Sequence, residues 1–305
     1  MQQLEQLRSS IRMLEDLQAV VRTMKAMARV AVSRYETVRE SLQGYGANVD
    51  LALHAFLQDR RFQERAGLPS FLIGAAGPPA GVGVILFGSD QGLCGTFNER
   101  VLSRHRELLR DLDLEGGTCR RAVVGQRLAA LLAAADGAGD PGFALPHAVE
   151  GITRLIQDLL LLIEEWRFGD DPLDQLLLVH HRVEGTARSE PVVIQLLPLE
   201  RGWLQHLWDR PWDSRSRPLL LGEPTELFRM IVREIITVSL HRAAVESLAS
   251  ENAARLAAMH SAERNLEDRL GELNHAYRRE RQNAITSELL DVVAGFEALQ
   301  RKEEP

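Results

Sequence analysis

Cysteine is almost missing from this sequence of 305 residues, which contains only Cys94 and Cys119. Two cysteines can form neither a disulfide framework nor a cysteine-rich metal site. This excludes a small disulfide-stabilised secreted domain, and we expect the chain to fold in a reducing cytoplasm.

Aromatic residues and long apolar runs are also scarce. Aromatic residues make up 5% of the chain and charged residues 26%, which is typical of coiled helices rather than of a sandwich or barrel. No apolar run reaches the roughly 18 residues of a membrane span, and the N-terminus lacks the apolar block of a signal peptide. The net charge of −7 argues against general nucleic-acid binding.

Proline is absent from the stretch between Thr225 and Arg301, which we predict to be one long helix. At 1.5 Å per residue it would span about 110 Å. Its apolar residues form a narrow stripe, interrupted by Glu263 and Glu280, that suits a coiled coil better than a globular core. The stripe consists of Leu256, Met259, Leu266, Leu270, Leu273, Tyr277, Ala284, Leu289, Val293, Phe296 and Leu299.

The other end of the chain carries a matching stripe, so residues 1 to about 60 are predicted to form a second helix of roughly 85 Å. We expect the two helices to wind together as an antiparallel coiled coil. Gly44 and Gly46 each cost about 1 kcal/mol relative to alanine, and we place a bend or a loss of coiling there. The stripe contains Leu4, Leu7, Ile11, Leu14, Met24, Ala28, Ala31, Tyr35, Val38, Leu42, Tyr45, Val49, Ala52 and Phe56.

Between these helices the pattern changes to short strands that alternate with helices, which predicts a small Rossmann-like α/β domain. The fold class is therefore an α/β insert on an all-α shaft. The predicted domains are residues 1–62, 63–218 and 219–305. Strands are expected at residues 82–87, 121–124, 176–183 and 192–198, and helices at residues 98–110, 126–135 and 155–166.

A glycine-rich loop follows the first predicted strand, from Gly88 to Asn98, where phosphate-binding loops often lie. It contains neither a P-loop motif nor the glycine spacing of a dinucleotide fingerprint. A nucleophilic role for Cys94 would need a base and an electropositive pocket, and the sequence indicates neither. We interpret the glycines as allowing a tight backbone path, with Asn98 as a polar helix cap.

Two other groups of residues resemble functional sites only superficially. His180 and His181 are neighbours on a predicted strand, so their side chains point to opposite faces and cannot share a metal ion. Trp203, Trp208 and Trp212 follow no repeat, and we expect them to anchor a loop on the domain rather than stack on bases.

The first helix carries a basic strip without any acidic residue, made of Arg22, Lys25, Arg29 and Arg34. The first three share one face of the helix. The strip is either a solvated face or a surface that contacts an acidic partner, and the sequence alone favours the solvated face.

Three separated motifs give the chain a specific resemblance to the gamma subunit of F-type ATP synthases. Residues 89–98 read SDQGLCGTFN, close to the family's SDRGLCGGFN, and residues 249–259 read ASENAARLAAM, close to ASEHAARMAAM. The third motif lies between Tyr277 and Leu299 and includes Arg281, Gln282 and Thr286. Glutamine at position 91 and threonine at position 96 depart from the family, which suggests a divergent or second-copy rotary ATPase.

The resemblance implies a central-stalk rotor that couples ion flow to ATP synthesis or hydrolysis without chemistry or cofactors of its own. Its implied partners are the alpha and beta subunits, the epsilon subunit and the membrane c-ring, at the cytoplasmic face of a bacterial inner membrane. Contacts with beta are implied for Arg22, Met24, Lys25, Arg281, Gln282, Thr286 and Glu288. A foot loop facing the ring and epsilon is implied for Ser89, Asp90, Gln91, Gly92, Leu93, Cys94 and Gly95.

Two alternatives come from other classes of protein. A structural coiled-coil scaffold would explain the long helices but not the three ordered motifs. An enzyme that uses the loop around Cys94 would explain the middle domain but would leave the helices without a purpose.

Overall fold

The computed structural model describes residues 2–59, 81–112, 118–137, 139–146, 148–184 and 188–303. The chain divides into two compact units. One consists of Met1–Ala28 together with Leu256–Pro305, and the other is Arg29–Arg255. The predicted boundary between residues 62 and 63 lies outside the described residues, so the three-domain division stays a prediction.

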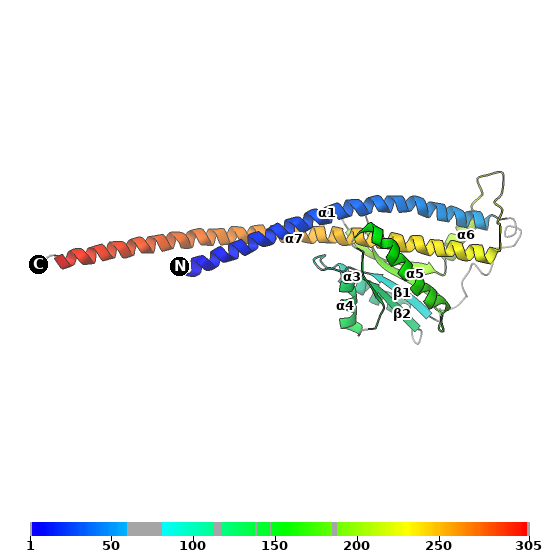
Figure 1. Ribbon diagram of the computed structural model, residues 1–305, viewed down its shortest axis with the longest axis horizontal. Coiled ribbons are helices and arrows are strands. Elements are labelled where there is room, and N and C mark those ends of the chain that lie inside the picture. Colours follow the sequence, from blue (N-terminus) through cyan, green and yellow to red (C-terminus); the bar gives the residue numbers. More distant parts are fainter. Residues whose placement is uncertain are drawn as a thin grey trace. The chain divides into compact units, whose positions relative to one another are not determined.

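Two long helices, α1 (Gln2–Leu57) and α7 (Pro224–Glu303), confirm the two helices expected from the apolar stripes (Figure 1). Helix α1 continues without interruption through Gly44 and Gly46, so the glycines do not end the helix. No helix among the described residues is long and apolar enough to cross a membrane.

Side-chain contacts show that the two helices run antiparallel within each unit. In the first unit, Lys25 of α1 contacts Glu263 of α7, and Arg22, which comes earlier in α1, also contacts Glu267, which comes later in α7. In the second unit, the Tyr45 hydroxyl of α1 donates a hydrogen bond to the Glu234 carboxylate of α7, and the rings of Phe56 and Phe228 lie 5.7 Å apart. Position along α7 therefore falls as position along α1 rises.

The second unit contains a five-stranded mixed sheet in the order β3-β2-β1-β4-β5. The central strand β1 pairs in parallel with β2 and β4, and β2 pairs in parallel with β3, whereas β5 is an antiparallel edge strand. The strands are β1 (Gly81–Phe87), β2 (Thr118–Val124), β3 (Gly142–Phe143), β4 (Gln175–Glu184) and β5 (Arg188–Leu197).

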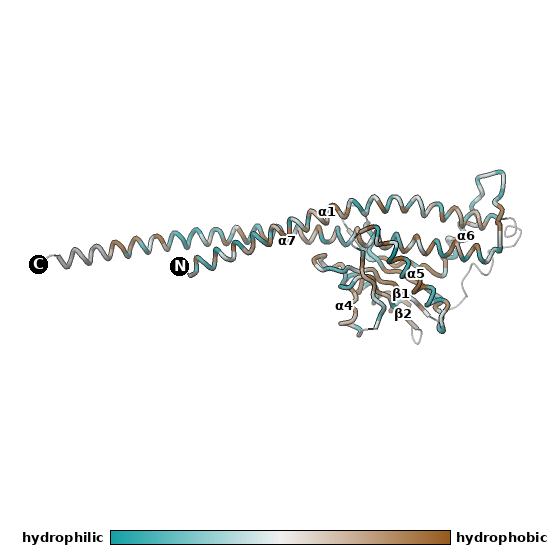
Figure 2. Tube along the Cα trace, in the orientation of Figure 1, coloured by the Kyte–Doolittle hydropathy of each residue, from teal (hydrophilic) through white to brown (hydrophobic). Residues whose placement is uncertain are grey.

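Helices cover both faces of this sheet, which is why all seven residues of β1 are buried. Ile85 and Phe87 pack with α5 and α7 on one face, and Val84 and Leu86 pack with α3 and α4 on the other. Figure 2 shows the apolar residues concentrated on these strands, whereas the two long helices alternate between apolar and polar residues. The helices are α3 (Phe97–Asp111), α4 (Gln126–Asp136), the 3-10 turn η2 (Val149–Gly151), α5 (Ile152–Phe168) and α6 (Arg201–Asp209).

Two elements were not expected from the sequence, β3 and α6. Trp203 and Trp208 belong to helix α6, so the expectation that they anchor a loop was wrong for these two residues. They pack at the edge of a small core formed by α6 and the end of α1. Trp212 does lie outside the helix, where its Nε1 donates to the Ser216 carbonyl at 3.1 Å. Helix α6 has only nine residues, too few to display a clear apolar period.

Gly44 offers a direct test of the continuous helix α1. A methyl group added there would meet nothing within 4 Å, so alanine fits without a clash. We expect Gly44→Ala to raise the free energy of unfolding by about 0.5–1 kcal/mol, because glycine loses more backbone entropy in a helix. Urea unfolding of the full chain measures this. As a control, Gly88→Ala should lower stability, since its methyl group would lie 2.3 Å from Leu128 Cβ.

His105 of α3 is fully buried, and neither of its ring nitrogens has a hydrogen-bond partner among the described residues. Burial, assisted by the positive charge of Arg121, lowers its pKa from 6.5 to about 4. The unfolded chain therefore takes up a proton on His105 at a higher pH than the folded chain does. Stability is lost as the pH falls below about 6.5 and continues to fall toward about 4.

We expect His105→Leu to remove this acid sensitivity. At about pH 4 the lowered pKa of His105 reduces the free energy of unfolding by an amount on the order of 3 kcal/mol. Urea unfolding at neutral pH and near pH 4 should give a smaller difference for the variant than for the natural chain. His206→Gln, at an exposed position on α6, is the matched control. An identical pH dependence in His105→Leu would show that His105 is not held neutral.

Candidate functional site

The glycine-rich loop connects β1 to α3 through a tight backbone path, as expected. Leu93 and Gly95 both have positive φ angles, of 64° and 63°. Gly88 has no room for a side chain against Leu128. At the tip of the loop Gln91, Gly92 and Leu93 are exposed.

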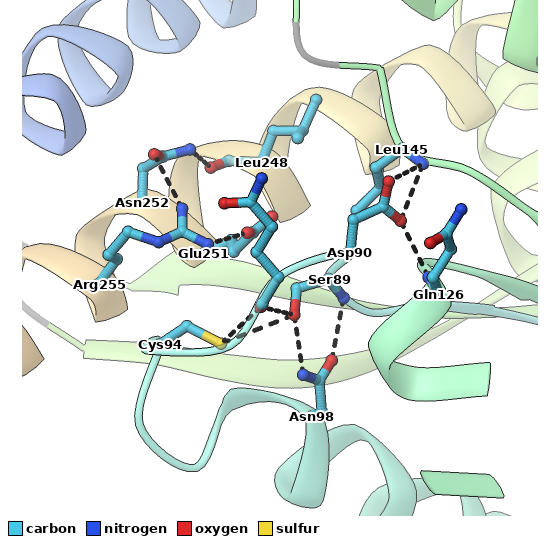
Figure 3. Close-up of polar contacts among 11 residues, drawn as sticks. Ser89, Asp90, Cys94, Asn98, Gln126, Leu145, Leu248, Glu251, Asn252 and Arg255 are labelled. Atoms are coloured by element: carbon cyan, nitrogen blue, oxygen red, sulfur yellow. Dashed lines mark hydrogen bonds and ion pairs between the residues drawn. The ribbon is translucent and has the colours of Figure 1, made fainter. Parts of the chain in front are cut away.

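The base of the loop is held by two buried side chains, Ser89 and Asn98 (Figure 3). Asn98 Oδ1 accepts a hydrogen bond from the Ser89 backbone N–H at 2.9 Å, and Asn98 Nδ2 donates to Ser89 Oγ at 2.8 Å. Ser89 Oγ in turn donates to the Gln91 carbonyl at 2.8 Å. The expectation that Asn98 caps a helix was wrong: it lies in the first turn of α3, and its amide closes the loop instead.

Cys94 is buried inside this loop, with its Sγ 3.6 Å from Ser89 Oγ. Burial raises the pKa of the Cys94 thiol. A nucleophilic cysteine is partly exposed and has a lowered pKa, so the buried position of Cys94 disfavours catalysis by this residue. Among the described residues, no group of His, Cys, Asp or Glu side chains is placed to hold a metal ion.

Asp90 fastens the loop to two other segments of the α/β unit. Its Oδ1 accepts from the backbone N–H of Gln126, the first residue of α4, at 2.9 Å. Both of its carboxylate oxygens lie 3.1 Å from the backbone nitrogen of Leu145. A carboxylate at the start of a helix also interacts favourably with the helix dipole. The loop is therefore fixed from inside by Asn98 and from outside by Asp90.

The second of the three sequence motifs begins on α7, and its residues 249–255 pass close to this loop. Arg255 contacts Glu251 at 2.6 Å and Asn252 at 3.3 Å, and Asn252 Nδ2 donates to the Leu248 carbonyl at 2.8 Å (Figure 3). A cavity of about 130 Å³ separates these α7 residues from the loop. Its lining includes Tyr35, Asp90, Gln91, Leu145, Glu251 and Arg255. Two motifs far apart in sequence thus face one small space.

The histidine pair on β4 is divided between the two faces of the sheet, as predicted. His180 Nε2 lies 2.9 Å from the Glu246 carboxylate of α7. His181 Nε2 donates to the Phe97 carbonyl of α3 at 3.0 Å, and burial lowers the pKa of His181 to about 4. Sequence reasoning missed Glu246, a buried carboxylate on α7. Although burial opposes it, the hydrogen bond from His180 and the charge of Arg182 lower the pKa of Glu246.

In the first unit, the first two residues of the basic strip of α1 have an acidic partner within the same chain. Glu263 accepts from Arg22 Nε at 3.2 Å and from Lys25 Nζ at 2.6 Å, and these hydrogen bonds lower its pKa. This explains why Glu263 interrupts the apolar stripe of α7. The Arg22 side chain remains 59% exposed, so it can also contact another molecule. Met24 is half-buried.

The predicted contact residues of α7 lie far from this ion pair. Arg281, Gln282, Thr286 and Glu288 are all exposed, and the Thr286 hydroxyl donates to the Gln282 carbonyl at 2.9 Å. Arg281 makes no ion pair or side-chain hydrogen bond with any residue that the structure describes. Arg281 lies about 27 Å along the helix from Glu263. The two predicted sets of residues therefore lie on separate stretches of the helices.

Comparison with known proteins identifies relatives over nearly the whole chain. The model of the family described as ATP synthase matches residues 3–299. The ATP synthase gamma chains of Synechococcus sp. strain PCC 6716 and of Thermosynechococcus vestitus are each 28% identical to it. Each alignment covers 98% of this chain and the full length of the relative.

Two solved structures share the fold. A chain of the Euglena gracilis mitochondrial ATP synthase (OSCP, F1 and c-ring) has a TM-score of 0.64 at 16% identity, covering 99% of this chain and 96% of that one. A chain from the central stalk and c-ring of the Tetrahymena thermophila mitochondrial enzyme has a TM-score of 0.54 at 18% identity. That match covers 80% of this chain and 99% of the other.

Removing the Asp90 carboxylate should loosen the loop. We expect Asp90→Ala to lower the free energy of unfolding by about 1–2 kcal/mol, because two backbone N–H groups lose their acceptor. Urea unfolding measures the loss, and Gln91→Ala, one residue further at an exposed position, should change stability by less than about 0.5 kcal/mol. Equal stabilities of the two variants would mean that Asp90 does not fix the loop.

Proposed function

Because the chain belongs to the gamma-chain family of ATP synthase, we propose that it is the central-stalk rotor of an F1Fo ATP synthase. It couples ion flow through the membrane ring to ATP synthesis or hydrolysis on a hexamer of alpha and beta subunits. The observation that carries this function is the match over residues 3–299, which includes both long helices and the α/β unit between them.

A rotor of this kind works by mechanical transmission and makes no bonds of its own. One elementary charge crossing the membrane yields only about 2.3 kcal/mol per 100 mV, so the energy of several ions must be pooled before ATP is made. The rotor biases each catalytic subunit by making different contacts with it in each orientation. The raised pKa of Cys94 and the closed loop around it agree with a non-catalytic role.

Transmission requires a stiff element, and we infer that the paired parts of α1 and α7 form an antiparallel coiled coil. In the first unit Ala28 and Met259 are buried on the apolar stripes of the two helices. Lys25 and Glu263 form an ion pair between the helices, as flanking residues of coiled coils do. These contacts support a two-stranded structure that resists bending.

The end of α7 supports insertion into a hexamer of alpha and beta subunits. Within the first unit α7 extends past the N-terminus of α1 (Figure 1). Its apolar side chains there remain exposed, and an exposed apolar stripe marks an interaction surface. They are Ile285, Leu289, Leu290, Val292 and Val293. We assign the neighbouring Arg281, Gln282, Thr286 and Glu288 to contacts with beta, and Arg22, Met24 and Lys25 to a second contact with beta.

The α/β unit is proposed to lie at the foot of the stalk, against the c-ring and the epsilon subunit. The parallel strands with helices on both faces support a Rossmann-like domain. The loop where such domains bind phosphate is here filled by Ser89 and Asn98. The exposed tip formed by Gln91, Gly92 and Leu93 is available to a partner, and Leu93 is 60% exposed. The complex would place the chain peripherally at the cytoplasmic face of a bacterial membrane.

Affinity purification of the tagged chain from its native cells in mild detergent tests the rotor function. We expect alpha and beta subunits in threefold excess over this chain, together with ATPase activity. Recovery of the chain alone or as an inactive homodimer would instead support the structural scaffold.

Replacing Arg281 and Gln282 together by alanine tests the proposed contact with beta. We expect weaker assembly or reduced ion pumping per ATP hydrolysed, because charge-assisted hydrogen bonds to beta would be lost. ATP-driven ion uptake in membrane vesicles, divided by the ATPase rate, measures the coupling. Arg269→Ala is the matched control, an exposed arginine of α7 that pairs with Glu272. Unchanged assembly and unchanged coupling in the double variant would remove these residues from the contact.

A further inference from the structure

A polar cavity of about 330 Å³ lies between α1, β4 and α7 in the second unit. Helix α1 contributes residues at spacings of three and four, so they share one face. The cavity contains three arginines, each from a different one of these elements. Its polar lining consists of Arg39, Gln43 and Asp50 of α1, Arg182 of β4, and Arg242 and Glu246 of α7.

The positive charges of this cavity exceed the negative charges that neutralise them. Glu246 is already occupied, because it contacts His180 Nε2 at 2.9 Å and Arg182 Nε at 3.2 Å. Arg39 and Arg242 form no ion pair or hydrogen bond with any described residue, and Arg39 Nε is buried without a partner. Arg39 and Arg242 are half-buried, and their positive charge has no acceptor among the described residues, so the cavity favours an anion.

Asp50 restricts which anion can enter. Partial desolvation raises the pKa of Asp50, although the positive charge of Arg242 acts in the opposite direction. The Arg242 side chain lies against α1 at Gly46, where the missing side chain leaves room for it. The Asp50 carboxylate has no hydrogen-bond donor among the described residues. It would repel a fully ionised anion but can accept a hydrogen bond from an anion that carries a proton.

We propose that this cavity binds a phosphate group that retains one proton. Arg39 and Arg242 would donate to its ionised oxygens, since the planar guanidinium matches the geometry of phosphate. The P–OH would donate to Asp50. Free hydrogen phosphate keeps such a proton at neutral pH, and a phosphate monoester keeps it below its second pKa of about 6, whereas sulfate carries no proton in this range. A phosphate held this way connects α1 to α7, and this inference does not depend on the rotor function.

Isothermal titration calorimetry of the purified full chain tests the site. The probes are inorganic phosphate, glycerol phosphate as a monoester, and sulfate, at equal ionic strength and at about pH 6, where much of the monoester still carries its proton. We expect saturable binding of phosphate and at least about tenfold weaker binding of sulfate, from the loss of one hydrogen bond to a charged group. Equal affinity for glycerol phosphate would identify monoesters as ligands, and binding of inorganic phosphate alone would identify the free anion.

Variants of the cavity residues separate a specific site from general charge attraction. Arg39→Gln and Arg242→Gln should each weaken phosphate binding about tenfold. The urea midpoint of Arg39→Gln should not fall, because the Arg39 side chain has no hydrogen bond or ion pair to lose among the described residues. Asp50→Asn should reduce the preference for phosphate over sulfate. The matched control is Arg229→Gln, an exposed arginine of α7 paired with Glu226, which should bind phosphate normally.

Two results would overturn the proposal. One is the absence of saturable phosphate binding to the natural chain at millimolar concentrations. The other is an unchanged affinity in the Arg39→Gln/Arg242→Gln double variant, which would place any bound phosphate elsewhere.

Discussion

The structure depends on covering the narrow apolar stripes of two very long helices. A helix of 80 residues cannot bury such a stripe against itself, and in water it would leave its apolar face exposed. Antiparallel pairing of α1 and α7 covers the stripes wherever the two helices lie side by side within a unit. The pairing also brings Glu263 to Arg22 and Lys25, so the polar residue that interrupts the apolar stripe becomes an ion-pair partner.

The α/β unit uses a different face of α7 to complete its own core. Leu240, Ala244 and Leu248 pack against the sheet together with α5. Glu246 on the same helix segment meets His180 of β4. A paired, hydrogen-bonded carboxylate is tolerated in a buried position, whereas an unpaired one is not. Helix α7 therefore belongs both to the helix pair and to the domain inserted between the helices.

The loop after β1 is held in place by hydrogen bonds, and its geometry does not favour catalysis. Asn98 and Asp90 connect it to α3, α4 and the segment at Leu145, all through hydrogen bonds to the backbone or to Ser89. This arrangement occupies the place where related topologies bind phosphate. A rotor subunit benefits from such a loop, because force passed through a soft connection would be lost as local motion.

The sequence alone determined the two long helices, most strands and helices of the α/β unit, and the gamma-chain family. The helices and strands follow from periodicity and turn residues, which are local properties of the sequence. The family follows from three motifs that occur in the expected order. It also predicted that His180 and His181 point apart, which follows from strand geometry. The short elements β3 and α6 carry too few residues for a readable period.

Only the tertiary structure decided which distant side chains meet. Asn98 has the residue type of a helix cap, yet the fold places it against Ser89. The polar cavity of about 330 Å³ joins Arg39, Arg182 and Arg242, which are more than 50 residues apart along the chain. Such contacts depend on helix register and on the packing of α7 on the sheet. These are long-range properties that no local pattern encodes.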